Sequence, residues 1–127
     1  MHTVALHALN KLQGNKTACY ISRQVLREFM CIMTRPQTFL PMPDMTTVMA
    51  QVQYLENHMH ILEEDYYTTQ TLLGLLAKFS VGGKRIHDAN IVANMMVHGI
   101  SHLLTHNVKD FEAFSSLITI HPLDNIA

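Results

Sequence analysis

Residues 82–111, GGKRIHDANIVANMMVHGISHLLTHNVKDF, combine an amphipathic helical segment with a short apolar strand. Asp88 falls on the first turn of the predicted helix, and Asp110 comes just after the predicted strand Leu103–Thr105. Open α/β sheets bind ligands at the carboxyl ends of their strands, so we expect the two acids to face one crevice. Paired carboxylates in such a crevice hold a divalent metal or transfer protons.

Composition indicates one globular domain covering residues 1–127, because 48% of the residues are hydrophobic. Nine Lys and Arg against ten Asp and Glu give a net charge of −1, so nucleic-acid binding needs a local basic patch. The apolar run Leu72–Ala77 is too short to span a membrane, and the N-terminus does not resemble a signal peptide. We therefore expect a cytoplasmic protein, with Cys19 and Cys31 as small core residues of a reducing compartment.

Strands alternate with helices along the chain, which predicts an α/β fold with a doubly wound, mainly parallel sheet and helices on both faces. Apolar periodicity, caps and breakers predict strands over 18–21, 60–62, 103–105 and 117–120. By the same criteria, helices are expected over 4–12, 22–34, 45–57, 66–80 and 88–98, with a proline-rich loop over 36–43.

Asp88 lies in the apolar stripe of the predicted helix 88–98, which carries Ile91, Val92, Met95 and Met96. The simpler interpretation is an acid that the helix dipole stabilises by about 0.3–1 kcal/mol. A carboxylate pointing along an apolar stripe nevertheless needs a metal, a cation or a water-filled cleft, because burying it alone is costly. We therefore favour a functional role for Asp88.

The other acids are less distinctive from spacing alone. Glu28 sits on the shoulder of the stripe of helix 22–34, nearer the core than Arg23, Arg27 or Cys31, and is as consistent with an exposed glutamate as with a site residue. For Asn107 and Asp110, spacing favours an Asx-turn and a solvated loop acid. The acidic run over 63–65 is typical of a solvated helix start.

Nine histidines raise the alternative of a structural zinc site. We disfavour it because Gly99 breaks the i, i+4 register of one set and no cysteine pair supports either set. The two sets are His58-x-His60 and His98/His102/His106.

Three segments together resemble the PIN domain, the fold of metal-dependent ribonucleases that includes VapC-type toxins. The segments are Ile21–Phe29, Lys84–Ala89 and Leu104–Phe111, within a resemblance that runs from about Ala18 to Pro122. Each segment alone is weak evidence for the family, and the resemblance depends on their order and spacing.

A doubly wound domain that is not a nuclease, such as a receiver-like regulator, is a further alternative. It needs an aspartate at the end of a central strand and a switch lysine, and we find no convincing pair of this kind.

The resemblance implies a ribonuclease that hydrolyses RNA phosphodiesters with Mg²⁺ or Mn²⁺, with Glu28, Asp88 and Asp110 as its acids and Asn107 in the fourth position. Thr105 would hydrogen-bond a metal-bound water. RNA is the implied partner, and in the toxin branch a small antitoxin would occupy the cleft. Basic residues that could contact RNA phosphates are Arg27, Lys84, Arg85 and Lys109.

One family feature is missing: a first strand with an Asp-Thr-Asn-like motif, which supplies the first metal-binding aspartate. In the family that strand lies between the strands predicted here at 18–21 and 103–105. An empty slot would leave buried backbone groups without hydrogen-bond partners, and each such group would lower the stability by about 1–3 kcal/mol. We therefore expect an N-terminally truncated domain whose missing strand lies upstream. The alternatives are that the remaining strands close up or that a homodimer fills the slot by swapping. The alternative function is a catalytically degenerate PIN-like module that binds RNA or a protein.

Overall fold

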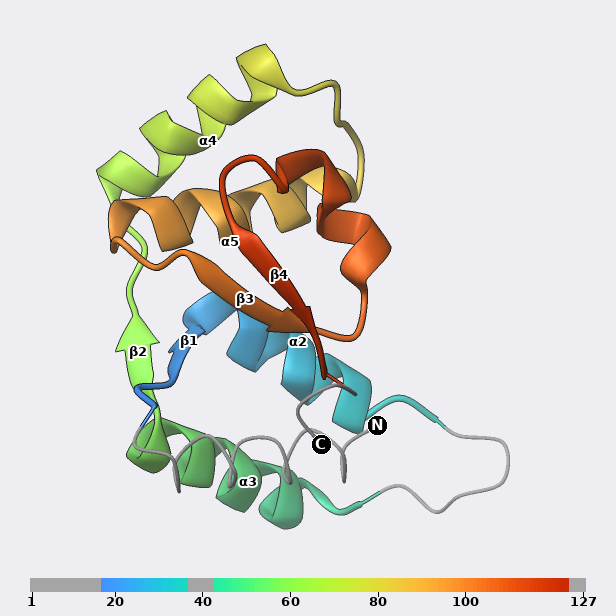
Figure 1. The fold of residues 1–127 in the computed structure, drawn as a ribbon. Helices are drawn as coiled ribbons and strands as arrows, with labels where there is room; N and C mark the ends of the chain where they lie inside the picture. The colour runs from blue at the N-terminus through green and yellow to red at the C-terminus, as the bar shows by residue number, and fades with distance from the viewer. Residues whose placement is uncertain (1–16, 37–42, 124–127) are drawn as a thin grey trace. The chain divides into compact units, whose positions relative to one another are not determined.

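The computed structural model describes residues 17–36 and 43–123, which fall into two compact units, residues 18–63 and 64–123 (Figure 1). The helix predicted over 4–12 and most of the predicted proline-rich loop lie outside the described residues. Each unit contains one pair of parallel strands together with helices. We describe each unit by itself.

The unit formed by residues 18–63 contains a parallel strand pair and two helices. Strand β1 (Tyr20–Ser22) pairs with β2 (His60–Leu62), with Tyr20 opposite His60. Helices α2 (Arg23–Met33) and α3 (Met45–His58) make the crossover between the strands. Such a crossover is what a parallel pair requires.

Short polar side chains begin both helices of this unit, as the sequence predicts. The Ser22 hydroxyl accepts a hydrogen bond from the Val25 N–H at 3.1 Å. The Asp44 carboxylate accepts from the Thr47 N–H at 2.8 Å, and this bond lowers the pKa of Asp44. Each bond satisfies a backbone donor that the first helical turn leaves without a partner.

The unit formed by residues 64–123 packs two helices beside a second parallel pair. Helix α4 (Tyr66–Lys78) lies along α5 (Arg85–Val97), and strand β3 (His102–Thr105) pairs with β4 (Thr119–Pro122) (Figure 1). The 3₁₀ helix η1 (Val108–Phe114) lies between the strands in sequence and packs against α5.

The mixed α/β class and the parallel pairing are confirmed. The described strands form two two-stranded sheets, β1–β2 and β3–β4. A single doubly wound sheet that joins all four strands remains a prediction.

Two predicted boundaries in residues 64–123 are wrong, for local reasons. Helix α5 begins at Arg85 rather than at residue 88, because the Arg85 N–H bonds the Gly82 carbonyl and Gly83 adopts a φ of 58°. The last strand begins at Thr119 rather than at 117. The N–H groups of Leu117 and Ile118 both bond the Phe114 carbonyl, so these two residues belong to the turn that follows η1.

Some side chains predicted for the core are exposed. Cys31 is exposed on α2 and Cys19 is half-buried, where desolvation raises the pKa of its thiol. On α5, Ile91, Val92 and Met95 are buried as predicted, whereas Met96 is 41% exposed. Apolar neighbours in the sequence do not reveal which arc of a helix another element covers.

None of the helices in the described part of the chain is long and apolar enough to cross a membrane.

A buried hydrogen bond fixes α4 against α5. The Thr68 hydroxyl donates to the Asn94 Oδ1 at 3.0 Å, and both residues are only 1% exposed. The same hydroxyl accepts a bond from the Asp65 N–H, and the Asp65 carboxylate caps α4 in return. The acidic run before α4 is therefore a helix start, as predicted.

We predict that Asn94→Ala lowers the free energy of unfolding by about 1–3 kcal/mol, because it leaves the buried Thr68 hydroxyl without its acceptor. Urea denaturation measures the change. Asn90→Ala is the matched control, since it removes a solvent-exposed bond to Glu64 and should cost at most about 1 kcal/mol. Equal losses in the two variants would contradict this account of the α4–α5 contact.

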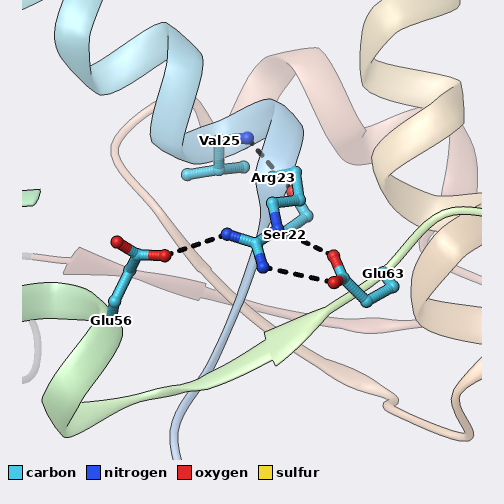
Figure 2. A network of polar contacts seen from close by, with 5 residues as sticks. All are labelled: Ser22, Arg23, Val25, Glu56 and Glu63. Atoms are coloured by element: carbon cyan, nitrogen blue, oxygen red, sulfur yellow. Dashed lines mark hydrogen bonds and ion pairs between the residues drawn. The ribbon is translucent and has the colours of Figure 1, made fainter. Parts of the chain in front are cut away.

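Arg23 connects the start of α2 with α3 and the end of β2 (Figure 2). Its guanidinium donates to Glu63 at 2.7 and 3.2 Å and to Glu56 at 2.9 Å. The hydrogen bonds with Glu63 are the main reason that the pKa of Arg23 is raised, and the bonds from Arg23 lower the pKa of Glu63. All three side chains are well exposed, so the network adds little stability in water.

The lowered pKa of Glu63 predicts a small acid-dependent loss of stability. The unfolded state binds the proton more readily, so this contribution is complete above the ordinary glutamate pKa of about 4.3. It is lost as the pH falls through the lower pKa of the folded state. In denaturant titrations at decreasing pH, Glu63→Gln should lose less stability than the wild type over this window. Glu28→Gln, which changes an exposed acid on α2 in the same unit, should decline like the wild type. Identical curves for Glu63→Gln and the wild type would exclude this contribution.

Candidate functional site

A hollow of about 440 Å³ lies just beyond the carboxyl end of β3. The chain leaves the strand at Thr105 and enters η1 at Val108, so this turn lines the hollow. The lining residues are His106, Asn107, Val108, Lys109 and Asp110. Two of the predicted site residues, Asn107 and Asp110, are therefore brought to one surface.

Backbone hydrogen bonds shape this turn. The Asn107 N–H donates to the Thr105 hydroxyl oxygen at 3.0 Å, and the Asp110 N–H donates to the Asn107 carbonyl at 3.0 Å. Thr105 thus contacts the backbone of the turn. Its predicted hydrogen bond to a metal-bound water remains a prediction, and the hydroxyl proton is available for it, because the observed bond uses the oxygen as acceptor.

An ion pair joins the turn to α5. The Arg85 Nη1 lies 3.0 Å from the Asp110 Oδ1, and the two side chains are 50% and 38% exposed. Water screens such a pair, so it contributes at most about 1 kcal/mol to stability and exchanges readily. The ion pair brings the starts of two elements together, because Arg85 is the first residue of α5 and Asp110 lies in the first turn of η1.

Asp88 lies on the first turn of α5 and is half-buried. It follows Arg85 by three positions, so the two residues occupy one side of the helix start. Arg85 contacts Asp110, and Asp88 and Asp110 are therefore carried by the starts of two elements in contact. The predicted pairing of the two carboxylates themselves remains a prediction.

Glu28 lies on α2, in the unit formed by residues 18–63. Its place beside Asp88 and Asp110 remains a prediction. It is exposed rather than near the core, because Gln24 and Leu26 are the residues that α2 buries. Arg27, a predicted phosphate contact on the same helix, is also exposed.

The basic residues near the hollow are accessible. Lys109 is exposed and lines the hollow, and Lys84 is exposed at the start of α5 beside Arg85. Predicted phosphate contacts therefore lie on both elements that carry the acids. Their binding to RNA remains a prediction.

Oxygen donors of the kind that Mg²⁺ and Mn²⁺ prefer come from Asp88, Asp110 and the amide of Asn107. Over residues 17–36 and 43–123, no three His, Cys, Asp or Glu side chains form a group that could hold a metal ion. A cation at Asp110 would also compete with the Arg85 guanidinium. The donor chemistry fits a hard cation, and the predicted metal remains a prediction.

One hydrogen bond between histidine side chains, His102 and His121, was not predicted from the sequence. The His102 Nδ1 lies 2.9 Å from the His121 Nε2, across the β3–β4 pair. The two residues are 19 positions apart, so local spacing rules cannot detect them. One sequence feature could have indicated the contact: His102 and His121 each lie next to a predicted strand, 103–105 and 117–120, and these strands were expected to be parallel.

No protein-family model matches this chain, and no curated protein matches it significantly. The resemblance to the PIN domain therefore rests on the three motifs quoted above.

Proposed function

We propose that this protein is a metal-dependent endoribonuclease of the PIN type that cleaves RNA at the hollow following β3. The observation that carries the proposal is the ion pair between Arg85 and Asp110. Through it, the starts of α5 and η1, each with an acid in its first turn, are in contact beside an open hollow. Acids gathered beyond the carboxyl end of a parallel strand are typical of ligand sites in α/β folds.

The donor set suits Mg²⁺ or Mn²⁺ better than a softer ion. Magnesium sites commonly use one or two carboxylates, with water and substrate phosphates completing the shell. Asp88 and Asp110 would supply the carboxylates, and the Asn107 amide oxygen a further ligand. Bound there, the ion would supply an oriented water and charge neutralisation at the leaving oxygen.

The cationic side chains would bind the RNA backbone. Arg85 is half-exposed, so its guanidinium can transfer from Asp110 to a phosphate, for which its planar donors are well suited. This exchange would free the Asp110 carboxylate as RNA binds. Lys109, on the same surface, and the neighbouring Lys84 would add phosphate contacts.

The partners follow from the same proposal. In a toxin–antitoxin pair, a small antitoxin would cover the hollow and block RNA. A homodimer is the second partner that the proposal includes.

A second candidate is RNA binding without cleavage, by a degenerate module. It is favoured by the same Arg85–Asp110 pair, because the guanidinium already neutralises a carboxylate that a metal would need. The two candidates share the RNA-binding surface and differ in whether metal and acids are required.

We predict that Asp88→Asn and Asp110→Asn each reduce Mn²⁺-dependent cleavage of a fluorescent single-stranded RNA at least about tenfold. Outer-shell partners alone typically cost about 10–100-fold, and a direct ligand should matter no less. Glu112→Gln is the matched control, since it changes an exposed acid of η1 that does not line the hollow, and should retain activity. Chelation with EDTA should abolish cleavage.

Cleavage that survives either aspartate variant, or that persists in EDTA, would contradict the nuclease proposal. Binding of the same RNA, measured by fluorescence anisotropy, identifies the second candidate when it occurs without cleavage. Glu28→Gln then tests the third acid: lost cleavage with retained RNA binding would place Glu28 in the site.

A further inference from the structure

We propose that the outward face of α4 is a dimer interface, on which a second copy of this chain packs its own α4 in the antiparallel direction. The proposal deepens, and rests on, the homodimer included in the proposed function, but it requires neither RNA nor a metal. Its basis is the exposed apolar surface of α4 and the order of large and small side chains along it. The surface lies within the unit formed by residues 64–123.

The outward face of α4 is apolar for a helix face in contact with water. Tyr66, Tyr67 and Leu73 are 68%, 65% and 54% exposed. Lys78, in the last turn, is the one charged residue among the 13 of α4. The face of a surface helix that points away from the core normally carries charged and polar side chains. Large exposed apolar side chains gathered on one face are instead typical of an interaction site, and tyrosine is enriched in such sites.

Gly74 leaves open space on the same helix. A Cβ atom at this position would meet nothing within 4 Å, so packing within the chain does not require a glycine here. Glycine in a helix interior also makes the helix less stable than alanine would. A hollow of about 260 Å³ lies at Gly74 and is also lined by Phe79, Met96 and Leu117. This space is available to a side chain from a second copy.

The order of side chains along α4 favours an antiparallel pair. The two tyrosines lie in the first turn, whereas the small residues Gly74 and Ala77 lie in the second half of the helix. When a two-fold axis passes near the middle of α4, the bulky start of each helix packs on the small residues of its partner. Helical spacing then places Tyr66 opposite the partner's Ala77 and Tyr67 opposite the partner's Gly74.

Charge favours the same direction. In a parallel pair the two Lys78 side chains would be neighbours, and like charges at close range repel each other. In the antiparallel pair they lie about 20 Å apart along the helix axes, beyond the Debye length of about 8 Å. Each Lys78 then lies at the same end of the pair as the partner's Glu64 and the partner's Asp65, which are exposed acids.

The size of the contact predicts its strength. A helix of 13 residues is about 20 Å long and about 10–12 Å wide. Stable interfaces bury about 1,200–2,000 Å² in total, which is more than one pair of such helices provides. We therefore expect a weak dimer that forms as the protein concentration rises.

Sedimentation equilibrium of the full chain, without RNA or metal, tests the interface. Leu73→Glu should raise the dimer dissociation constant at least about tenfold, because it buries a charge at the centre of the contact. Gly74→Leu should also weaken the dimer, since it fills the space that the partner's Tyr67 needs, and it should not destabilise the monomer. Ile32→Glu is the matched control, because it introduces the same charge at a 44% exposed apolar residue of α2, and it should leave dimerisation unchanged.

A chain that stays monomeric at millimolar concentration would overturn the proposal. A dimer that both α4 variants leave intact, or that the control weakens equally, would do the same. RNA cleavage is not a readout of this experiment, so a failure of the nuclease proposal and a failure of this interface are distinguished.

NMR of the wild type gives a test that does not depend on how the variants fold. The Tyr66 ring and the Ala77 methyl group lie about 16 Å apart along one α4, too far for a nuclear Overhauser effect within a chain. This effect should appear as the dimer forms, together with one between the Tyr67 ring and the Gly74 Hα. Intermolecular effects confined to other surfaces, or effects that join Ala77 only to the partner's Ala77, would overturn the antiparallel interface.

Discussion

Parallel pairing of β3 with β4 is the constraint on which the candidate site depends. Parallel neighbours cannot be joined by a tight hairpin, so the chain must leave β3 and cross over before it enters β4. The crossover here begins with the turn at Asn107 and continues through η1. It therefore places Asn107 and Asp110 directly beyond the end of β3.

Solvent exposure determines how the charged groups at this place can act. Arg85 and Asp110 form an ion pair at 3.0 Å, but the Arg85 side chain is 50% exposed and the Asp110 side chain 38%. Water weakens the attraction between the two groups, so the pair contributes little to stability. The Arg23 network has similar distances and exposure, but one guanidinium there serves two carboxylates, Glu56 and Glu63 (Figure 2). The Arg85–Asp110 pair thus joins two side chains, whereas Arg23 connects the start of α2 with α3 and with the residue after β2.

The sequence predicted best what local chemistry determines. The caps Ser22, Asp44 and Asp65 define helix starts because each binds backbone donors within three residues. The wheel of α5 also predicted its buried residues Ile91 and Val92. These features need no knowledge of distant contacts.

Prediction failed where the answer depends on which surface is covered. The wheel of α2 put Glu28 on the shoulder of the apolar stripe and left an exposed position equally open; Glu28 is exposed, and the helix buries Gln24 and Leu26. Met96 continues the apolar stripe of α5 and is nevertheless 41% exposed. The His102–His121 contact depends on strand register, which a single sequence does not specify at this precision. For the proposed acid pair, the sequence predicted the segments that carry Asp88 and Asp110. It did not predict that Arg85 would join these segments by an ion pair with Asp110.

The central claim is that the starts of α5 and η1 together form a cation-binding surface. Paramagnetic broadening of backbone amide signals by substoichiometric Mn²⁺ tests it most directly. We predict that the strongest intensity losses fall on Asp88 and on residues 107–110, and that Asp110→Asn abolishes them. Broadening that is strongest elsewhere, with these amides unaffected, would contradict the account.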